Sequence, residues 1–227
     1  GSAADDNSGS LTYVKICYAG ARSTADIEHN GLTLNGVGNG TKIENIYVLE
    51  SADDAIEFFG GTVNVTNLLA VNPDDDMFDF TQGYCGTLKN CYGVWERDYT
   101  STEADPRGIE ADGNMDGLYP DHLRQSDFKV ENMTIVNNAA NTADNVDRMQ
   151  DVIKIRRGAK ATITNALVKG TGGAIDLVDM KDSKGAGNIE SSINITSTLS
   201  LTGLKLNGEL NTFVESADNT GADASLF

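Results

Sequence analysis

The sequence has few cysteines, prolines and aromatic residues, and it has no long apolar run. Its three cysteines, Cys17, Cys85 and Cys91, are an odd number without regular spacing, which argues against a disulfide framework. No CxxC motif or Cys/His cluster indicates zinc. No apolar run approaches the length of a membrane span. The opening Gly1-Ser2 resembles a cloning remnant, so we expect residues 1–8 to be a tag or disordered lead and any export signal to lie outside this chain.

Positive charge is also scarce. The chain has 34 acidic and 17 basic residues, and its formal net charge is -17. Such a surface repels phosphate backbones, so we expect no nucleic-acid partner. It suits cations, although solubility alone would also explain it.

The sequence is rich in a six-residue pattern: apolar, any, Asn, apolar, any, apolar or small. The copies are residues 43–48, 65–70, 88–93, 130–135 and 163–168, and an earlier copy at 11–16 has Tyr13 in place of Asn. The Asn residues are spaced by 22, 23, 42 and 33 residues, which indicates insertions between fixed anchors. Asn tolerates the left-handed conformation that a sharp corner needs, and stacked Asn side chains can hydrogen-bond to one another.

A second pattern, apolar-polar-apolar, follows each anchor as a half-buried strand would. Its polar centres are Thr33, Glu57, Asp79, Glu110, Lys154 and Asp176. Together the patterns predict an all-β fold, a right-handed parallel β-helix of about six to eight rungs, each with three short strands, with loop insertions. We expect the helix to cover residues 9–180, and residues 181–227 to form the final rung or rungs and an irregular C-terminal cap.

Three runs carry a resemblance to known proteins: GLTLNGVGNGT (31–41), DDAIEFFGGTVNVTNLLAVNPDDDMFDFTQGYCG (53–86) and GIEADGN (108–114). They resemble a group of secreted or lipid-anchored proteins of Bacteroidetes, similar in outline to the pectin-lyase-like β-helix superfamily. The resemblance implies export and a cell-surface or extracellular setting. It implies no particular activity, and no run matches the catalytic motif of a pectate lyase or polygalacturonase.

Four of the polar centres are the candidate catalytic residues. Stacked rungs place them about 4.8 Å apart at the backbone. If the protein is an enzyme, the acids could flank a glycosidic bond, and Lys154 or Arg156 could act as the base of a lyase. The candidates are Glu57, Asp79, Glu110 and Lys154.

The turns before these strands are acidic as well, and they predict a candidate calcium site. Calcium takes six to eight oxygen ligands, which adjacent rungs could supply. The candidate ligands are Asp53, Asp54, Asp74, Asp75 and Asp76. Aspartate also favours turns for its own backbone contacts, so the alternative is that these residues only cap turns. No cofactor is required by the sequence.

Two insertions, residues 96–107 and 112–127, bracket Glu110 and carry the candidate ligand-binding groups. Tyrosines can stack on sugar rings and arginines can grip carboxylates. The candidates are Arg97, Tyr99, Arg107, Tyr119, His122 and Arg124. Alternatively, these loops fold down and neutralise the acidic line.

The leading hypothesis from sequence is a secreted or cell-surface β-helix that binds a glycan or another surface ligand without catalysis. The first alternative is a polysaccharide lyase or glycoside hydrolase that acts on an extended polysaccharide. The second is a structural or adhesin spacer. The oligomeric state has no signal in the sequence.

Overall fold

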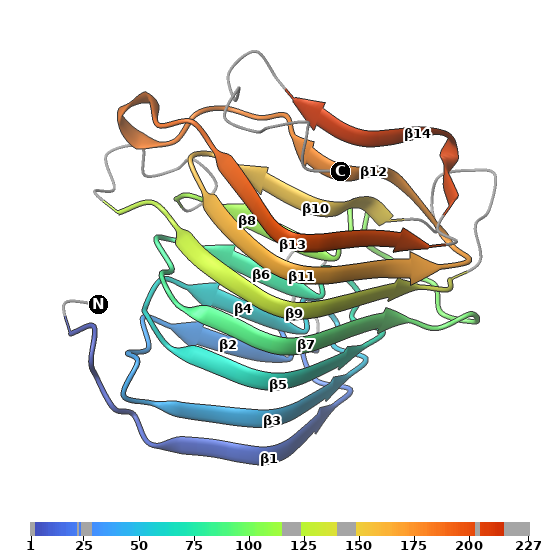
Figure 1. Cartoon of the computed structure of the whole chain (residues 1–227). Coiled ribbons are helices and arrows are strands. Elements are labelled where there is room, and N and C mark those ends of the chain that lie inside the picture. The colour runs from blue at the N-terminus through green and yellow to red at the C-terminus, as the bar shows by residue number, and fades with distance from the viewer. Residues whose placement is uncertain are drawn as a thin grey trace.

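The computed structural model describes residues 3–21, 23, 29–114, 124–139, 149–202 and 205–215. Over these residues the protein is a right-handed parallel β-helix, which confirms the predicted fold class. Its strands pair in parallel into two sheets of seven strands each, a number within the predicted range of rungs (Figure 1).

The two sheets alternate along the chain, so each rung contributes one strand to each. The first, here called the corner sheet, contains β1 (Ser10–Cys17), β3 (Lys42–Leu49), β5 (Asn64–Val71), β7 (Thr87–Trp95), β9 (Asp127–Asn137), β11 (Lys160–Gly170) and β13 (Ser192–Thr202). The second, here called the groove sheet, contains β2 (Leu32–Asn35), β4 (Ile56–Phe59), β6 (Phe78–Thr81), β8 (Ile109–Asp112), β10 (Met149–Arg156), β12 (Gly173–Met180) and β14 (Lys205–Glu215). One 3-10 turn, Ala186–Asn188, precedes β13.

The predicted asparagine column lies on the corner sheet. All its members have positive φ angles: Asn45 58°, Asn67 60°, Asn90 54°, Asn132 57° and Asn165 59°. From Asn67 onward, each side-chain amide donates to the side-chain oxygen of the Asn one rung earlier, at 2.8–3.0 Å. Tyr13 takes the same conformation in β1, with φ 56°. The column is therefore confirmed, and its left-handed backbone explains the bend of each strand there.

One detail of the predicted rung is wrong. We expected separate strands on either side of the Asn corner. Instead, β5 continues through Asn67, and both halves pair with β3 and β7 in the same sheet. A single left-handed residue bends a strand without ending its ladder, so a rung holds two strands.

A row of stacked aromatic rings fills the core behind the groove sheet. The rings of Phe58 and Phe80 are 5.1 Å apart at their centroids, and those of Phe80 and Phe128 are 4.1 Å apart. These side chains are fully buried, and each contributes about 1.5–3 kcal/mol of hydrophobic stabilisation. Strand alternation then turns Glu57 and Asp79, the neighbours of Phe58 and Phe80, away from this core.

The C-terminal part continues both sheets. Strands β13 and β14 pair with β11 and β12. The part of the predicted cap beyond residue 215 lies outside the described residues. Within those residues, no helix is long and apolar enough to cross a membrane. All three cysteines are free thiols.

Candidate functional site

Each rung from β4 to β12 carries two polar side chains three residues apart. In the rungs of β4, β6 and β8 the first precedes the groove-sheet strand and the second lies on it, whereas in β10 and β12 both lie on the strand. The pairs are Asp54 and Glu57, Asp76 and Asp79, Arg107 and Glu110, Asp151 and Lys154, and Asp176 and Asp179. The strand members align as Glu57 with Asp79 and Asp79 with Glu110. The backbone N–H of Met77 donates to the carbonyl of Arg107 at 3.1 Å, so the preceding members stack too. Two columns of polar groups therefore cross the groove sheet.

The predicted line of polar centres needs one correction. Lys154 aligns with Asp179, not with Asp176, which aligns with Asp151. Apolar residues flank both aspartates, so the apolar-polar-apolar pattern alone could align either one with Lys154. Pairing along the whole of β12 fixes the register, because Ile153 aligns with Val178.

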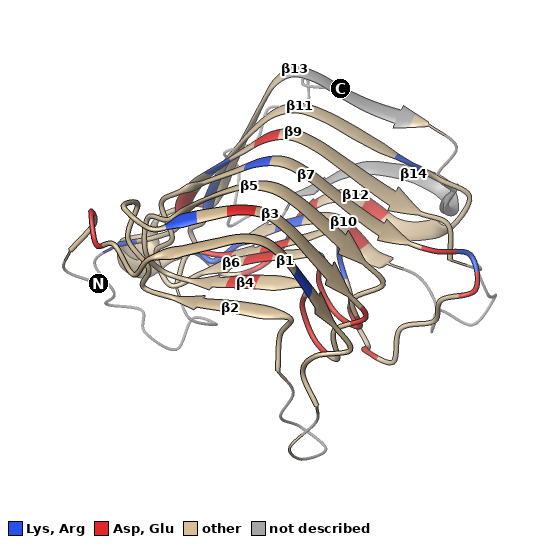
Figure 2. Ribbon diagram, turned by 90° about the horizontal axis from the view of Figure 1, so that it is seen from below, with Lys and Arg blue, Asp and Glu red and all other residues tan. Residues whose placement is uncertain are grey.

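Residues from adjacent rungs surround a hollow of about 460 Å³, here called the acidic hollow. It is lined by Asp53, Asp54, Glu57, Phe59, Asp75, Asp76, Asp79, Thr81, Glu110 and Asp112. No lysine or arginine is among these residues. In Figure 2, the ribbons of β4 and β6 carry acidic positions, drawn in red. The volume is in the range of sites that bind small ligands.

Several carboxylates of the acidic hollow are both buried and short of partners. Asp54, Asp76 and Asp79 are only 4%, 2% and 8% exposed. The Oδ1 atoms of Asp75, Asp76 and Asp79 have no hydrogen-bond partner among the described residues. Buried carboxylate oxygens normally have partners, so these atoms leave a place for a partner other than the described residues.

The carboxylates also lie close enough to share a cation. Within each of three groups, one oxygen per residue lies within 4.8 Å of the others. The groups are Asp53, Asp54 and Asp75; Asp54, Glu57 and Asp79; and Asp76, Asp79 and Glu110. Carboxylate oxygens are the ligands that calcium prefers.

Burial changes the ionisation of this cluster. It raises the pKa of Asp54, Asp76 and Asp79 well above the usual range, and neighbouring carboxylates raise it further. Burial also raises the pKa of Asp75 to about 8, with Glu110 adding to the effect. Without a cation, part of the cluster therefore holds protons at neutral pH.

The next two rungs carry their own positive charges. The Nε of Arg107 lies 3.2 Å from Asp151, and its Nη2 lies 2.9 Å from Asp105. Its Nη1 donates to Glu110. Arg107 is 6% exposed, so it forms a buried bridge between β8 and β10. Among the predicted ligand-binding residues, this one fits the alternative that the loops neutralise the acids.

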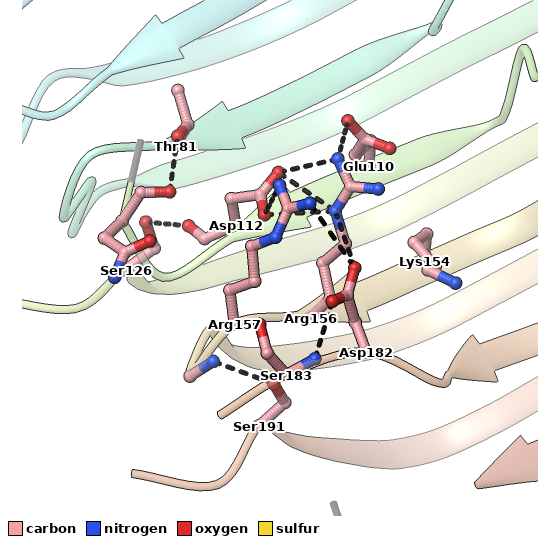
Figure 3. Close-up of polar contacts among 12 residues, drawn as sticks. Thr81, Glu110, Asp112, Ser126, Lys154, Arg156, Arg157, Asp182, Ser183 and Ser191 are labelled. Atoms are coloured by element: carbon pink, nitrogen blue, oxygen red, sulfur yellow. Dashed lines mark hydrogen bonds and ion pairs between the residues drawn. The ribbon is translucent and has the colours of Figure 1, made fainter. Parts of the chain in front are cut away.

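Arg156 and Arg157 neutralise the far end of the hollow. Figure 3 shows both guanidinium groups turned toward Asp112, at 3.0 Å and 3.1 Å. Arg156 also binds Glu110 at 2.8 Å. Burial raises the pKa of Asp112 to about 6, and the two arginines hold it down.

The structure brings together three of the four candidate catalytic residues. Glu57, Asp79 and Glu110 line the acidic hollow. Lys154 is not among the lining residues, and its ammonium lies 3.0 Å from Asp179. The base proposed for a lyase is therefore engaged elsewhere.

Of the five candidate calcium ligands, Asp53, Asp54, Asp75 and Asp76 line the hollow. Asp74 instead holds the 96–107 insertion. The hydroxyl of Tyr99 donates to its Oδ1 at 3.1 Å, and the backbone N–H of Thr102 donates to the same atom at 2.7 Å.

The remaining candidate binding residues are dispersed. Arg97 and Tyr99 line a separate hollow of about 430 Å³, together with Asn72. Arg124 is exposed. Tyr119 and His122 lie outside the described residues.

Sequence reasoning gave no role to Asp179, Arg157 or Asp182. The signal that could have found Asp179 is the recurrent spacing of two polar residues at i and i+3, which places 176 and 179 in one rung. Arg157 and Asp182 lie in turns, at 3.5 Å from each other, and no repeat marks them.

The repeated rungs and the two parallel sheets have a counterpart among known families. A family model described as a pectate-lyase-like beta-helix domain matches residues 1–225. The chain belongs to this family. No curated protein and no solved structure matches it significantly. In this pectate-lyase-like β-helix domain, the acidic hollow is the candidate site, because it combines buried carboxylates with oxygens that have no partner among the described residues.

Proposed function

We propose that this β-helix domain is a secreted or cell-surface protein that binds a polysaccharide in the acidic hollow, with calcium as part of the binding site. The observation that supports the proposal is a hollow that, over the part of the chain the structure describes, is lined by eight carboxylates and by no cationic side chain. Buried carboxylates without positive partners are costly, and a bound divalent cation removes that cost.

The residues that line the acidic hollow are suited to a sugar ligand. Sugar hydroxyls can donate to carboxylates or complete the coordination of a calcium ion. Phe59 lines the hollow beside Glu57 and Thr81, and an aromatic ring can pack against the apolar face of a sugar. The groove sheet extends in both directions, so a polymer could continue beyond the hollow (Figure 1).

The setting proposed is extracellular. Calcium sites of extracellular modules bind with dissociation constants of about 0.1–1 mM. A site of this kind would be filled where calcium is millimolar. The acidic composition also suits an exported protein.

The specific alternative is a retaining glycoside hydrolase. In such enzymes the two carboxyl groups are about 5–5.5 Å apart. The closest carboxylate oxygens of Glu57 and Asp79 lie within 4.8 Å, and Asp79 has a raised pKa, as a general acid requires. The lyase alternative has less support, because Lys154 is engaged by Asp179.

The test is retention on a panel of immobilised polysaccharides, in millimolar calcium and in excess chelator, with reducing ends measured in the same samples. We expect calcium-dependent retention without new reducing ends, and its loss in Asp79→Asn. Asp98→Asn, an exposed acid outside the acidic hollow, is the matched control and should bind normally. Retention that is equal in chelator would refute the role of calcium. New reducing ends that Glu57→Gln abolishes would establish the hydrolase instead.

A further inference from the structure

We infer that the N-terminal end of the β-helix is a dimerisation surface, on which β1 of one chain pairs antiparallel with β1 of a second copy. The acidic hollow takes no part in this contact, so the inference goes beyond the proposed function. β1 is the edge strand of the corner sheet, and β2 is the edge strand of the groove sheet (Figure 1). Together they form the first rung.

The apolar core is open at this rung. Leu11, Val14 and Ile16 pack against the core but are only partly buried. Their partners on β3 are almost completely buried: Ile43 is 3% exposed, Ile46 1% and Val48 1%. The same apolar positions therefore lose cover only at the end of the stack, where no rung precedes them among the described residues.

The described residues before β1 do not supply this cover. The backbone N–H of Asn39 donates to the carbonyl of Ala4 at 2.9 Å, and that of Gly40 donates to the carbonyl of Asp6 at 3.1 Å. These bonds hold the segment against the turn that precedes β3. Figure 1 shows the segment beside the stack, not below β1.

The backbone edge of β1 is also unpaired. Over the described part of the chain, β1 pairs with β3 and with no other strand. Proteins usually protect such an edge with charges, proline or a bulge. β1 and β2 contain no proline, and their one charged residue is Lys15. In a chain with a net charge of -17, a second copy therefore meets little repulsion from these strands.

The sequence of β1 is suited to pairing with itself. Counted from either end, the strand begins with an outward residue, then an inward one, then another outward one. An antiparallel register can therefore place Leu11 opposite Ile16 of the second copy, and Thr12 opposite its Lys15. Inward side chains meet inward side chains, and the two lysines are kept apart. A two-fold contact requires this self-complementarity, which favours a second copy over an unrelated strand.

Two exposed tyrosines lie on the same strand edge. Tyr13 is 85% exposed and Tyr18 is 72% exposed, and both have left-handed backbones, with φ 56° and 53°. The rungs from β3 to β11 have asparagine in place of Tyr13, and asparagine adopts this conformation with less strain. Tyrosine is a frequent anchor of protein interfaces. Contacts with a second copy offset the strain that Tyr13 introduces.

The dimer would extend both sheets. A two-fold axis through β1 and β2 places each strand against its own counterpart. Leu32 of β2, which is partly buried against the core, gains cover in the same contact. The two groove sheets then form one continuous surface, and the acidic hollow of each copy stays open.

The first test is sedimentation velocity of the full chain over a wide range of concentrations. We expect a dimer that dissociates on dilution. Val14→Lys places a charge on the open core and should weaken the dimer by at least about tenfold. Leu69→Lys is the matched control, because Leu69 is exposed on β5, two rungs from the edge, and this variant should dimerise normally. A monomer at every concentration, or a dimer that Val14→Lys does not weaken, would overturn the inference.

Disulfide trapping tests the register, and it does not depend on the folding of Val14→Lys. The proposed pairing places Ser10 opposite Cys17 of the second copy, and Cys17 is a free thiol. Opposed residues of antiparallel strands have Cα atoms about 4.5–5.5 Å apart, a distance that a disulfide can span. Ser10→Cys should therefore form a covalent dimer on mild oxidation, in higher yield than Thr12→Cys or the unmodified chain. Equal yields would contradict the antiparallel pairing of β1.

Discussion

The polar columns of the groove sheet are built in two ways. On β4 and β6, all four members are acids: Asp54, Glu57, Asp76 and Asp79. On β8 and β10, each rung combines one acid with one base, Arg107 with Glu110 and Asp151 with Lys154. The strands pair in parallel with their polar members aligned in both regions, so the contrast lies in the side chains. On β8 and β10 the columns include their own cations, so the polar groups there serve the fold. On β4 and β6 the columns themselves hold only acids, which is the basis of the proposed calcium site.

The largest loss of stability should follow removal of the Arg107 guanidinium group. Arg107→Met keeps most of the apolar stem but leaves Glu110 and Asp151 without this partner. Breaking a buried ion pair costs about 3–5 kcal/mol, and we expect a loss of unfolding free energy of that size in urea denaturation. Arg97→Met, at an exposed position, is the control and should change stability by less than about 0.5 kcal/mol. A loss below about 1 kcal/mol for Arg107→Met would mean that the β8 and β10 rungs do not depend on internal charge pairing.

The same substitution should have opposite signs in the two regions. Asp112→Asn weakens ion pairs with Arg156 and Arg157, and we expect it to cost about 1.5–3 kcal/mol. Asp79→Asn replaces a buried acid that has no cationic partner among the described residues, and we expect it to stabilise chelator-treated protein by about 1–2 kcal/mol. Chemical denaturation of both variants in chelator measures the difference. If both variants lose similar stability, the β4 and β6 acids have partners in the folded chain after all.

The stability of the metal-free protein should depend on pH because the pKa of buried acids in the hollow is raised. The pKa of Asp75 is raised from 3.8 to about 8 in the folded state. Between these values the folded chain binds more protons than the unfolded chain, so stability falls as pH rises through this window and the loss is complete above about 8. Burial raises the pKa of Asp151 only to about 6, so its contribution is already lost by about pH 6.

Thermal melting of chelator-treated protein across this range measures the effect. We expect the midpoint to fall between about pH 6 and pH 8, and the fall to be smaller in Asp75→Asn. A midpoint that rises over this interval in both chains would contradict the raised pKa of Asp75.

The smallest change in stability should come from the asparagine column on the corner sheet. Asn67 has φ 60° and exchanges amide hydrogen bonds with Asn45 and Asn90. Asn67→Ala loses those bonds and places alanine in a left-handed conformation, at a cost of about 1–2 kcal/mol. Asn67→Gly loses only the bonds, and we expect about half that cost in the same denaturation assay. Equal costs would show that backbone conformation is unimportant at the corner.

The fold was more predictable from sequence than the site. Asn45, Asn67 and Asn90 repeat one residue type, because each must adopt a left-handed conformation and pair with the next. A second row of left-handed residues, Tyr18, Glu50 and Asn72, has no shared residue type and left no signal.

For the site, periodicity predicted which acids stack but not what surrounds them. Asp74 and Asp75 are adjacent in a turn, yet Asp74 binds the 96–107 insertion and Asp75 faces the hollow. That division depends on where a loop from the next rung lies. Likewise, Asp176 and Asp179 are each the polar centre of an apolar-polar-apolar triplet. Only the pairing of β12 with β10 shows which of them aligns with Lys154.

The most direct test of the difference between the two regions is the melting temperature with and without calcium. At a calcium concentration of about 100 times the dissociation constant, binding stabilises the folded state by about 2.7 kcal/mol, which raises the midpoint of a chain of this size by about 5–10 °C. We expect this rise in the unmodified chain and in Asp98→Asn, and its absence in Asp79→Asn. An unchanged midpoint in the unmodified chain would show that the acids of β4 and β6 do not bind calcium.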